Sequence, residues 1–277
     1  MPALPPERES PPAPEPREIH QARAVAEGFG ADAARYDRAR PGYPQALVDR
    51  IVAASPGRDV LDVGCGTGTA ARQFQAADCT VLGVEPDARM AELARHGGLD
   101  VEVARFEAWE SAGREFDAVV AAQAWHWVDP VAGPAKAALV LRPGGRLAVF
   151  WNAFQLPPGM ERAFAGVYDR VATGLPFSPF ARPTLPSYLV MCDKATGGIR
   201  AAGTFSGPEQ WRSRWERPYT RDEWLDQVPT FGGHSRIPSG QLEDLLAGIG
   251  EVVDAAGGSF MMSYATVAVT ATRTGGA

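Results

Sequence analysis

Apolar residues along the chain follow two spacings that alternate, and this alternation predicts a sheet covered by helices. Short apolar runs have the composition of buried strands, and apolar residues at helical spacing lie between them, as in Met90, Leu93 and Ala94. Strands that alternate with helical segments favour a parallel α/β sheet with helices on both faces. The predicted strands cover residues 59–63, 79–84, 99–106, 116–122 and 147–151.

The pattern becomes less regular beyond the fifth predicted strand. Residues 160–171 predict a helix, and residues 175–204 read as a stretch broken by proline and glycine. Bulky residues alternate over 211–219, which indicates a strand, and residues 242–253 mark an amphipathic helix. Residues 263–273 alternate small polar residues with Val and Ala, as a final strand does.

A glycine-rich turn follows the first predicted strand. Gly64, Gly66 and Gly68 occupy every second position, and a helical segment begins near Thr69. Glycine permits the positive φ angles of a tight strand-to-helix turn, and its missing Cβ lets a ligand lie against the backbone. At the carboxyl end of a parallel strand, such a turn is typical of sites that hold a nucleoside-containing cofactor.

The spacing of these glycines begins to separate two cofactor families. Dinucleotide enzymes usually show G-x-G-x-x-G, and Thr69 stands where the third glycine would be. Glu85, about 20 positions further on, is placed to accept hydrogen bonds from both ribose hydroxyls, a task that suits either family. An NAD(P)-dependent oxidoreductase and a non-catalytic cofactor-binding protein therefore stay open as alternatives at this point.

The strand followed by Asp62-x-Gly64-x-Gly66-x-Gly68 resembles the first motif of class I S-adenosylmethionine-dependent methyltransferases. The resemblance extends over residues 27–152 and includes the segment 123–130. This segment is similar to the fourth-strand motif of small-molecule methyltransferases of the trans-aconitate methyltransferase-like group. It lacks the Asn/Asp-Pro-Pro-Tyr signature that many enzymes acting on nucleic-acid bases carry.

The resemblance implies a Rossmann-like α/β fold with a seven-stranded sheet, an antiparallel last strand, helices on both faces and a helical cover. It also implies S-adenosyl-L-methionine as cofactor and S-adenosyl-L-homocysteine as product. Because Arg105 stands where many members have an aspartate, adenine recognition would rest on Glu107 or on the backbone. The expected cofactor contacts are Asp62, Gly64, Cys65, Gly66, Gly68, Glu85, Pro86, Phe106, Glu107, Gln123 and Arg40.

Methyl transfer from a sulfonium needs an aligned acceptor and the exclusion of water, and it needs a general base only where the acceptor is protonated. His126 and Tyr36 are the candidate catalytic residues. His126 follows a strand end that faces the crevice, and imidazole titrates near neutral pH. The resemblance implies that the segment of Tyr36 folds over the cofactor, and packing of the first helices is the alternative role for Tyr36. An extended chain would send Trp125 and Trp127 to the face opposite His126. Packing between aromatic rings is the alternative role for His126. The candidate acceptor contacts are Trp125, Trp127, Trp151 and His234, the last on a loop that reads as flexible.

The chain has 277 residues, 45% hydrophobic content and a net charge of -6. It can therefore bury a sizeable core, and it has no general attraction to nucleic-acid phosphates. We expect a small-molecule acceptor, no nucleic acid and no membrane partner, since no apolar run reaches the ~18 residues of a membrane span and no signal sequence opens the chain. Cys65, Cys79 and Cys192 are scattered, which predicts no metal site and a cytoplasmic protein. The pattern does not separate a monomer from a homodimer.

We expect a flexible Pro-rich tail over residues 1–18, because that composition cannot bury enough apolar surface to order the chain. A single methyltransferase domain is expected over residues 19–277, with its N-terminal helical cap closing over the cofactor. The expected parts of this domain are the cap (19–55), a cofactor-binding core (56–152), a substrate-cover region (153–258) and the final strand (259–273).

Overall fold

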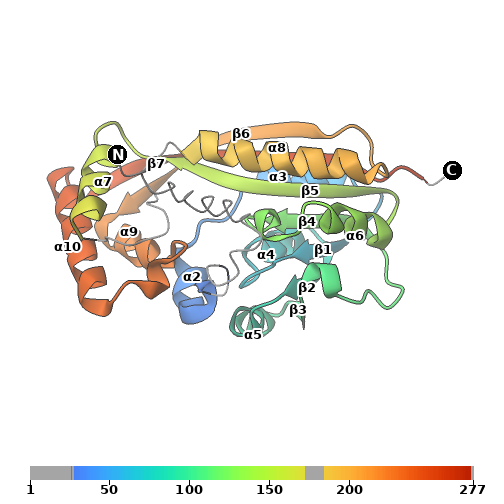
Figure 1. Ribbon diagram of the computed structural model, residues 1–277, viewed down its shortest axis with the longest axis horizontal. Coiled ribbons are helices and arrows are strands. Elements are labelled where there is room, and N and C mark those ends of the chain that lie inside the picture. The colour runs from blue at the N-terminus through green and yellow to red at the C-terminus, as the bar shows by residue number, and fades with distance from the viewer. Residues whose placement is uncertain (1–25, 27, 172–183, 276–277) are drawn as a thin grey trace, which may run out of the picture.

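Seven strands form one mixed sheet in the computed structural model, which describes residues 26, 28–171 and 184–275. The predicted tail over residues 1–18 lies outside the described residues. The strands are β1 (Asp59–Val63), β2 (Thr80–Glu85), β3 (Asp100–Val103), β4 (Phe116–Ala122), β5 (Leu141–Gln155), β6 (Glu209–Thr220) and β7 (Ser259–Thr272). Their order across the sheet is β3-β2-β1-β4-β5-β7-β6, as Figure 1 shows.

The sheet confirms the predicted Rossmann-like fold with an antiparallel last strand. Strands β1 to β5 pair in parallel, and β7 runs antiparallel between β5 and β6. A dinucleotide-binding sheet places its sixth strand directly beside the fifth. The insertion of β7 therefore distinguishes this sheet from that of a dinucleotide-binding fold.

Helices cover both faces of the parallel half of the sheet. They are α3 (Gln45–Ala53), α4 (Thr69–Ala76), α5 (Ala88–His96), α6 (Ala132–Val140) and α8 (Thr184–Ala202). Side chains alternate between the two faces along each strand: Leu61 and Val149 belong to one core with α6 and α8, whereas Val60 and Phe150 belong to the other with α3, α4 and α5. Figure 1 shows α8 in front of the sheet and α3, paler with distance, behind it.

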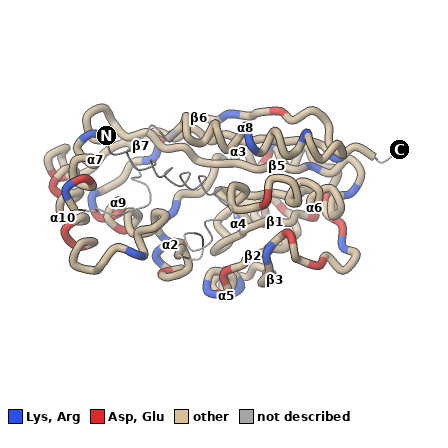
Figure 2. The backbone as a smooth tube through the Cα atoms, in the orientation of Figure 1, with Lys and Arg blue, Asp and Glu red and all other residues tan. Residues whose placement is uncertain are grey.

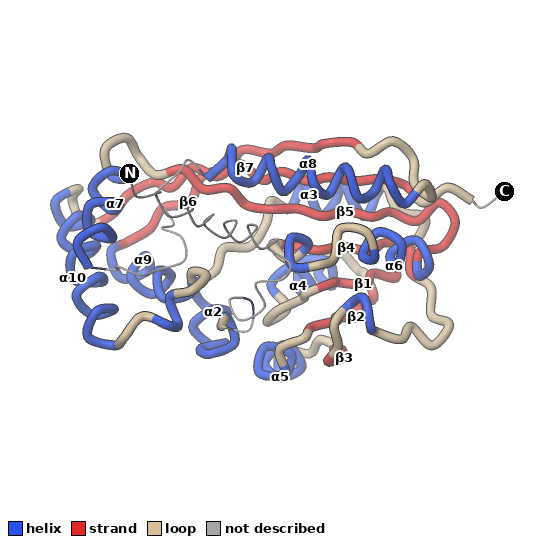
Figure 3. The backbone as a smooth tube through the Cα atoms, in the orientation of Figure 1, coloured by secondary structure: helices blue, strands red, loops and turns tan. Residues whose placement is uncertain are grey.

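The long strands β5, β6 and β7 extend beyond the parallel half and carry a second group of helices. These are α7 (Met160–Val171), α9 (Arg221–Gln227) and α10 (Ser239–Ala255), which pack with the far ends of the strands around Phe164, Trp224 and Leu245. Figure 3 shows the three strands running from one group of helices to the other. The expected substrate-cover region over 153–258 therefore also supplies β6 of the sheet and α8 of its cover.

Several predicted boundaries change in the structure. The predicted strands over 59–63 and 116–122 and the helix over 160–171 have the observed bounds, but β3 is shorter than predicted. The expected turn at residues 143–145 is wrong, because these residues lie within β5, at a register shift against β4. Within the described residues, no helix is long and apolar enough to cross a membrane.

The predicted break is also wrong over residues 184–202, because α8 is a continuous helix of 19 residues there. Residues 175–183 of this prediction lie outside the described residues. Pro186 lies in the first turn of α8, where the missing N–H has no helical partner to lose. Gly198 is present for packing, since a Cβ at this position would lie 2.1 Å from the carbonyl oxygen of Pro130. A Cβ at Gly197 would meet no atom within 4 Å.

These two adjacent glycines give a matched test of the packing of α8. Gly198→Ala should lower the free energy of unfolding by about 1–3 kcal/mol, because the new methyl group overpacks the contact with Pro130. Gly197→Ala should raise it by about 0.5–1 kcal/mol, because alanine favours the helix and meets no neighbour. Denaturant unfolding measures both values. Equal effects of the two substitutions would contradict the close approach.

Candidate functional site

The glycine-rich turn joins β1 to α4 with three left-handed residues. Gly64, Gly66 and Gly68 have φ angles of 67°, 57° and 89°, which explains why glycine occupies all three positions. A Cβ at Gly64 would lie 2.5 Å from the Cβ of Ala124, so this glycine also permits close packing. A Cβ at Gly66 would meet only Met90 Cε, at 3.9 Å. The turn therefore leaves room for a ligand beside Gly66.

Glu85 ends β2 next to this turn and is almost fully buried. Its two carboxylate oxygens accept hydrogen bonds from the backbone N–H groups of Gly66 and Asp87, both at 2.9 Å. Burial raises the pKa of Glu85 to about 7, although these two hydrogen bonds favour the ionised form. Asp87 caps α5 by accepting from Arg89 N, as its position before a helix predicts. Glu85 is thus fixed in place and keeps free lone pairs on both oxygens.

Asp62 is fully buried in β1, and neither of its oxygens has a hydrogen-bond partner of normal geometry within the described residues. Burial, and then the charge of Glu85, raise its pKa to about 7; the backbone N–H of Ala71 offsets this only in part. The hydroxyl oxygens of Thr67 and Thr69 are also buried without a partner. A buried polar group without a partner costs free energy, so this cluster fits a site for a polar ligand.

The remaining predicted cofactor contacts lie around the same strand ends. Cys65 is buried against Gly83, and burial raises the pKa of its thiol, which stays protonated. Phe106 is buried and Pro86 is exposed. The carboxylate of Glu107 accepts a hydrogen bond from the backbone N–H of Asp129 at 2.8 Å. One of its oxygens therefore binds the segment that follows β4.

Gln123 follows β4 with a φ angle of 57°, which a side chain other than glycine adopts only at a cost. Its backbone N–H donates to Phe150 O at 2.9 Å, and its Nε2 donates to Asn152 O at 3.2 Å. Its Oε1 is buried without a partner. A strained backbone beside an unpaired acceptor marks this position as part of the site.

An N-terminal cap, defined as η2 (Phe29–Asp32), α2 (Ala33–Ala39) and the loop to α3, is tied to these strand ends. Asn152 Nδ2 donates to Gly42 O at 3.0 Å, and Gln73 exchanges two hydrogen bonds with the backbone of Tyr43. Arg72 links the cap to the glycine turn, because its guanidinium donates to both Asp37 and Thr67 O. The cap therefore lies over the glycine turn.

The same cap also contacts the second group of helices. Arg35 and Arg38 form ion pairs with Asp226 of α9, at 3.2 and 2.7 Å. Arg40 donates to Thr230 O and lies over the ring of Phe231, at 5.2 Å from its centroid. Figure 2 shows charged residues of both signs on α2. The cap thus bridges the two groups of helices.

Tyr36 and Arg40 lie together on the inner part of this bridge. The Arg40 guanidinium is 4.9 Å from the centroid of the Tyr36 ring, and Phe29 contacts both Tyr36 and Trp127 edge-on. Arg40 Nε is buried without a partner, and Arg40 forms no ion pair within the described ranges. The guanidinium is therefore available to an anionic group.

The segment around His126 differs from its prediction. Residues Trp125–Trp127 form a 3-10 helix, η4, so the expectation of an extended chain is wrong. Trp125 is buried against Phe106 in the core, which makes it a packing residue in this structure. Trp127 remains half-buried, and its ring contacts those of Phe29 and His126.

Trp151 is fully buried, and its indole N–H donates to His126 Nδ1 at 3.1 Å. Burial lowers the pKa of His126 to about 4, so the ring is neutral near pH 7. The nitrogen that could take a proton is thus already engaged by Trp151. His126 and Trp151 meet at the site, but His126 does not present a free base at Nδ1.

The prediction that His234 lies on a flexible loop is wrong. The side chain is 1% exposed, and its Nε2 shares a hydrogen bond of 2.7 Å with the hydroxyl of Tyr168. Burial lowers its pKa to about 4. The residue packs with Phe231 in the second group of helices, so a contact with the acceptor is not supported by this geometry.

Sequence reasoning missed several residues that the structure brings to the site. Asn152 and Asp226 hold the cap through contacts with residues about 110 and 190 positions away in the chain, and no local pattern signals such contacts. Tyr188 of α8 is a third such residue. Burial raises the pKa of its hydroxyl, and the charge of Arg40 and a hydrogen bond with Gln123 offset this in part, so its side chain lies near both residues. A tyrosine within a helix is an ordinary core residue by sequence.

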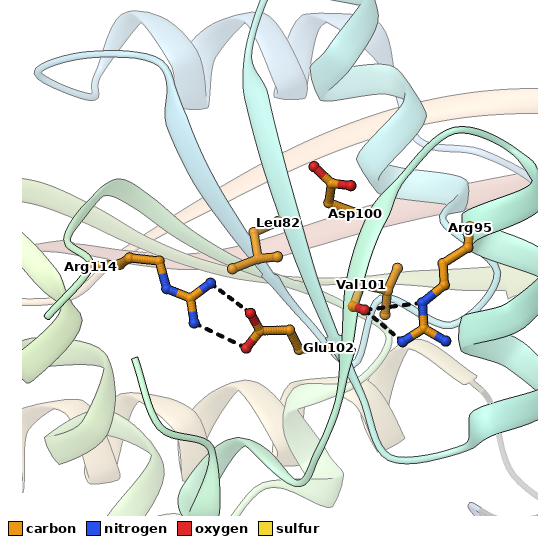
Figure 4. A pocket seen from close by; sticks show the side chains of 6 residues that line it. All are labelled: Leu82, Arg95, Asp100, Val101, Glu102 and Arg114. Carbon is orange, nitrogen blue, oxygen red and sulfur yellow. Dashed lines mark hydrogen bonds and ion pairs between the residues drawn. The ribbon is translucent and has the colours of Figure 1, made fainter. Parts of the chain in front are cut away.

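A surface hollow of about 340 Å³ lies elsewhere, at the amino-terminal half of β2 and β3. Figure 4 shows that three of its charged side chains are engaged: Arg114 pairs with Glu102 through two hydrogen bonds, and Arg95 donates to Val101 O. Ligands of open α/β sheets bind at the opposite, carboxyl ends of the strands. No group of three possible metal ligands occurs among the described residues.

Comparisons with known proteins agree with this geometry. A family model described as a methyltransferase domain matches residues 60–145. An uncharacterized methyltransferase of Mycobacterium tuberculosis is 34% identical over 171 residues, which are 58% of this chain and 70% of the relative. The malonyl-acyl-carrier-protein O-methyltransferase of Hahella chejuensis is 34% identical over 52% of this chain and 54% of its own. A solved structure described as a "Putative Type II Methyltransferase" from Anaeromyxobacter dehalogenans has a TM-score of 0.56 and 26% identity, and the match covers 83% of this chain and 97% of that one.

The raised pKa of Asp62 predicts a pH dependence of stability. The folded pKa of about 7 exceeds the usual value of 3.8, so the unfolded chain loses this proton first as pH rises. The wild-type free energy of unfolding should therefore fall between about pH 4 and 7 and then level off. Asp62→Asn cannot ionise, so the variant should gain up to about 4 kcal/mol relative to wild type across that window.

Urea unfolding without cofactor at several pH values measures this difference. Asp59→Asn is the matched control, because it removes a half-exposed carboxylate from the same strand. Its only expected effect on the free energy of unfolding is the loss of a partly exposed ion pair with Arg142, which contributes little. A difference between Asp62→Asn and wild type that stays constant from pH 4 to 7 would contradict the unpaired burial of Asp62.

Proposed function

Since this chain belongs to the class I S-adenosylmethionine-dependent methyltransferases, we propose that its cofactor lies between the glycine turn, Glu85 and the N-terminal cap. The enzyme is a methyltransferase, and we propose a small molecule as its acceptor. S-Adenosylmethionine supplies a methyl group that its sulfonium already activates. The protein then has to bind and orient the cofactor and the acceptor, and it has to exclude water.

The observation that supports this site best is the pair of buried carboxylates beside the open face of Gly66. Asp62 has two oxygens without partners, and Glu85 has lone pairs left on both oxygens. Such a pair fits a ligand that carries an ammonium group and two vicinal ribose hydroxyls. Arg40 is the cation available to a carboxylate of the same ligand. The residues present therefore fit S-adenosylmethionine.

The acceptor would lie between the cap and the residues that follow β4. His126 and Trp127 approach this space from η4, and Tyr36 approaches it from α2. Contacts between Phe29 and Trp127 and between Arg40 and Phe231 close it on two sides, which favours a small acceptor over a macromolecule. The role of Tyr36 would be to orient the acceptor through its hydroxyl.

Calorimetric titration with S-adenosylmethionine, S-adenosylhomocysteine and NAD tests the cofactor site. The first two ligands should bind, and NAD should produce no saturable heat. Glu85→Ala should weaken binding by about 5- to 150-fold, because two charge-assisted hydrogen bonds are lost. Gly66→Val should abolish it, because a branched side chain would fill the open face and strain a positive φ.

Glu92→Ala removes an exposed carboxylate from α5 and is the control for charge. It should bind as the wild-type protein does. Tight binding of NAD, or unchanged binding by Glu85→Ala, would contradict the proposed site.

The bridging contacts of the cap predict that cofactor binding slows its exchange with solvent. Amide hydrogen exchange over residues 28–44 should slow on addition of S-adenosylhomocysteine, because closing of such segments gates ligand exchange. Asn152→Ala removes the hydrogen bond to Gly42 and should speed exchange around residues 40–44 in the free protein. Exchange on the distant β6 serves as the internal control. Identical exchange with and without ligand would contradict the role of the cap.

A further inference from the structure

We infer that Trp151 is a positioning residue that holds His126 as the neutral Nε2–H tautomer, so that His126 donates a hydrogen bond to the methyl acceptor instead of removing its proton. The donating role rests on the proposed function, whereas the tautomer does not. The inference changes what the histidine can do, because a neutral imidazole has one donor nitrogen and one acceptor nitrogen.

The geometry of the contact decides which nitrogen is which. Trp151 Nε1 lies 3.1 Å from His126 Nδ1, and an indole nitrogen can only donate. Nδ1 therefore carries the lone pair in this contact. The single proton of the neutral ring must then be at Nε2, which faces away from Trp151 across the ring.

The donor is held rigidly by the sheet. Trp151 belongs to β5, pairs with Val267 of β7 and is fully buried in the core. His126 follows β4, whose residue Ala122 pairs with Phe150, the neighbour of Trp151. Trp151 thus lies in β5 directly after this pairing, and His126 follows the end of β4 beside it, so the sheet brings the indole and the imidazole together.

The environment of His126 also disfavours the imidazolium form. Burial is the cause of its lowered pKa, about 4, and no charged group of the described residues adds to the shift. The rings of Trp127 and Trp151 are its near neighbours, from η4 and β5. A donor at Nδ1 further stabilises the neutral ring, since protonation there would place two N–H groups against each other.

This tautomer restricts the acceptor by its chemistry. An Nε2–H group can orient an oxygen or nitrogen that accepts a hydrogen bond, but it has no lone pair with which to take a proton. The acceptors that fit are therefore nucleophiles that need no proton removed by His126 before the methyl transfer. The protein contribution to rate would then lie in alignment and in the exclusion of water.

Long-range ¹H–¹⁵N spectra of the protein labelled at histidine nitrogens test the tautomer directly. The chain has four histidines, and loss of one set of signals in His126→Gln assigns the residue. We expect His126 to show an unprotonated Nδ1 and a protonated Nε2 from pH 5 to 8, without titration. A protonated Nδ1 in the wild-type protein would overturn the inference without any variant. Titration of His126 near pH 6 to 7 would do the same.

Trp151→Phe tests the cause, because it keeps an aromatic ring but removes the indole N–H together with the rest of the five-membered ring. We expect an Nδ1–H form to appear in this variant and the pKa of His126 to rise by about one pH unit. Trp211→Phe is the matched control, since the indole of Trp211 donates to Glu209 on β6 and should leave His126 unchanged. An unchanged His126 spectrum in Trp151→Phe would also overturn the inference.

Binding of S-adenosylhomocysteine by the same samples separates this inference from the proposed function. Both Trp151→Phe and wild type should bind it, because neither side chain of the pair is among the expected cofactor contacts. If the wild-type protein does not bind S-adenosylhomocysteine, the proposed cofactor site is refuted, but the result for the tautomer of His126 is unaffected.

Discussion

The structure of the site depends on two carboxylates that are buried beside each other without a cation from the described part of the protein. Asp62 lies near the carboxyl end of β1, and Glu85 ends the adjacent parallel strand β2. Burial raises the pKa of each to about 7. Burying an unpaired charge is costly, so the free protein pays for this arrangement in stability. A cationic ligand with hydroxyl groups removes that cost. The same feature therefore explains the raised pKa values of the free site and supports the proposed binding of a cationic cofactor there.

The long strands determine how this site can be closed. Because β5, β6 and β7 extend beyond the parallel half, the helices α7, α9 and α10 stand opposite the carboxyl ends of the short strands. The cap fits between the two groups and contacts both, through Arg72 on one side and Asp226 on the other. Its ion pairs are partly exposed and individually weak. Their number suits the proposed role of the cap, which is to hold a ligand and also to release it.

The parts of the fold that could be predicted are those whose cause is local. The bounds of β1 and β4 follow from their apolar composition. The tight turn follows from the three glycines, which can adopt the positive φ angles observed there. The continuity of α8 could not be predicted, because Gly198 is explained by the carbonyl of Pro130 and not by the helix itself. The burial of His234 and the contact between Trp151 and His126 likewise depend on residues distant in sequence. The structure thus brings the predicted cofactor contacts together around the same strand ends, whereas it separates His234 and Trp125 from the other predicted acceptor contacts. The roles of both sets stay predictions.

Proton release on cofactor binding tests the central claim most directly. It is measured by calorimetry at about pH 6.5 in buffers of different ionisation enthalpy. At that pH both buried carboxyl groups are largely protonated in the free protein, and the ammonium group of the ligand is already charged. Binding of S-adenosylhomocysteine should therefore release protons to the buffer, and the Asp62→Asn variant should release fewer. Binding with no net proton release by the wild-type protein would contradict the claim that unpaired buried carboxylates form the site.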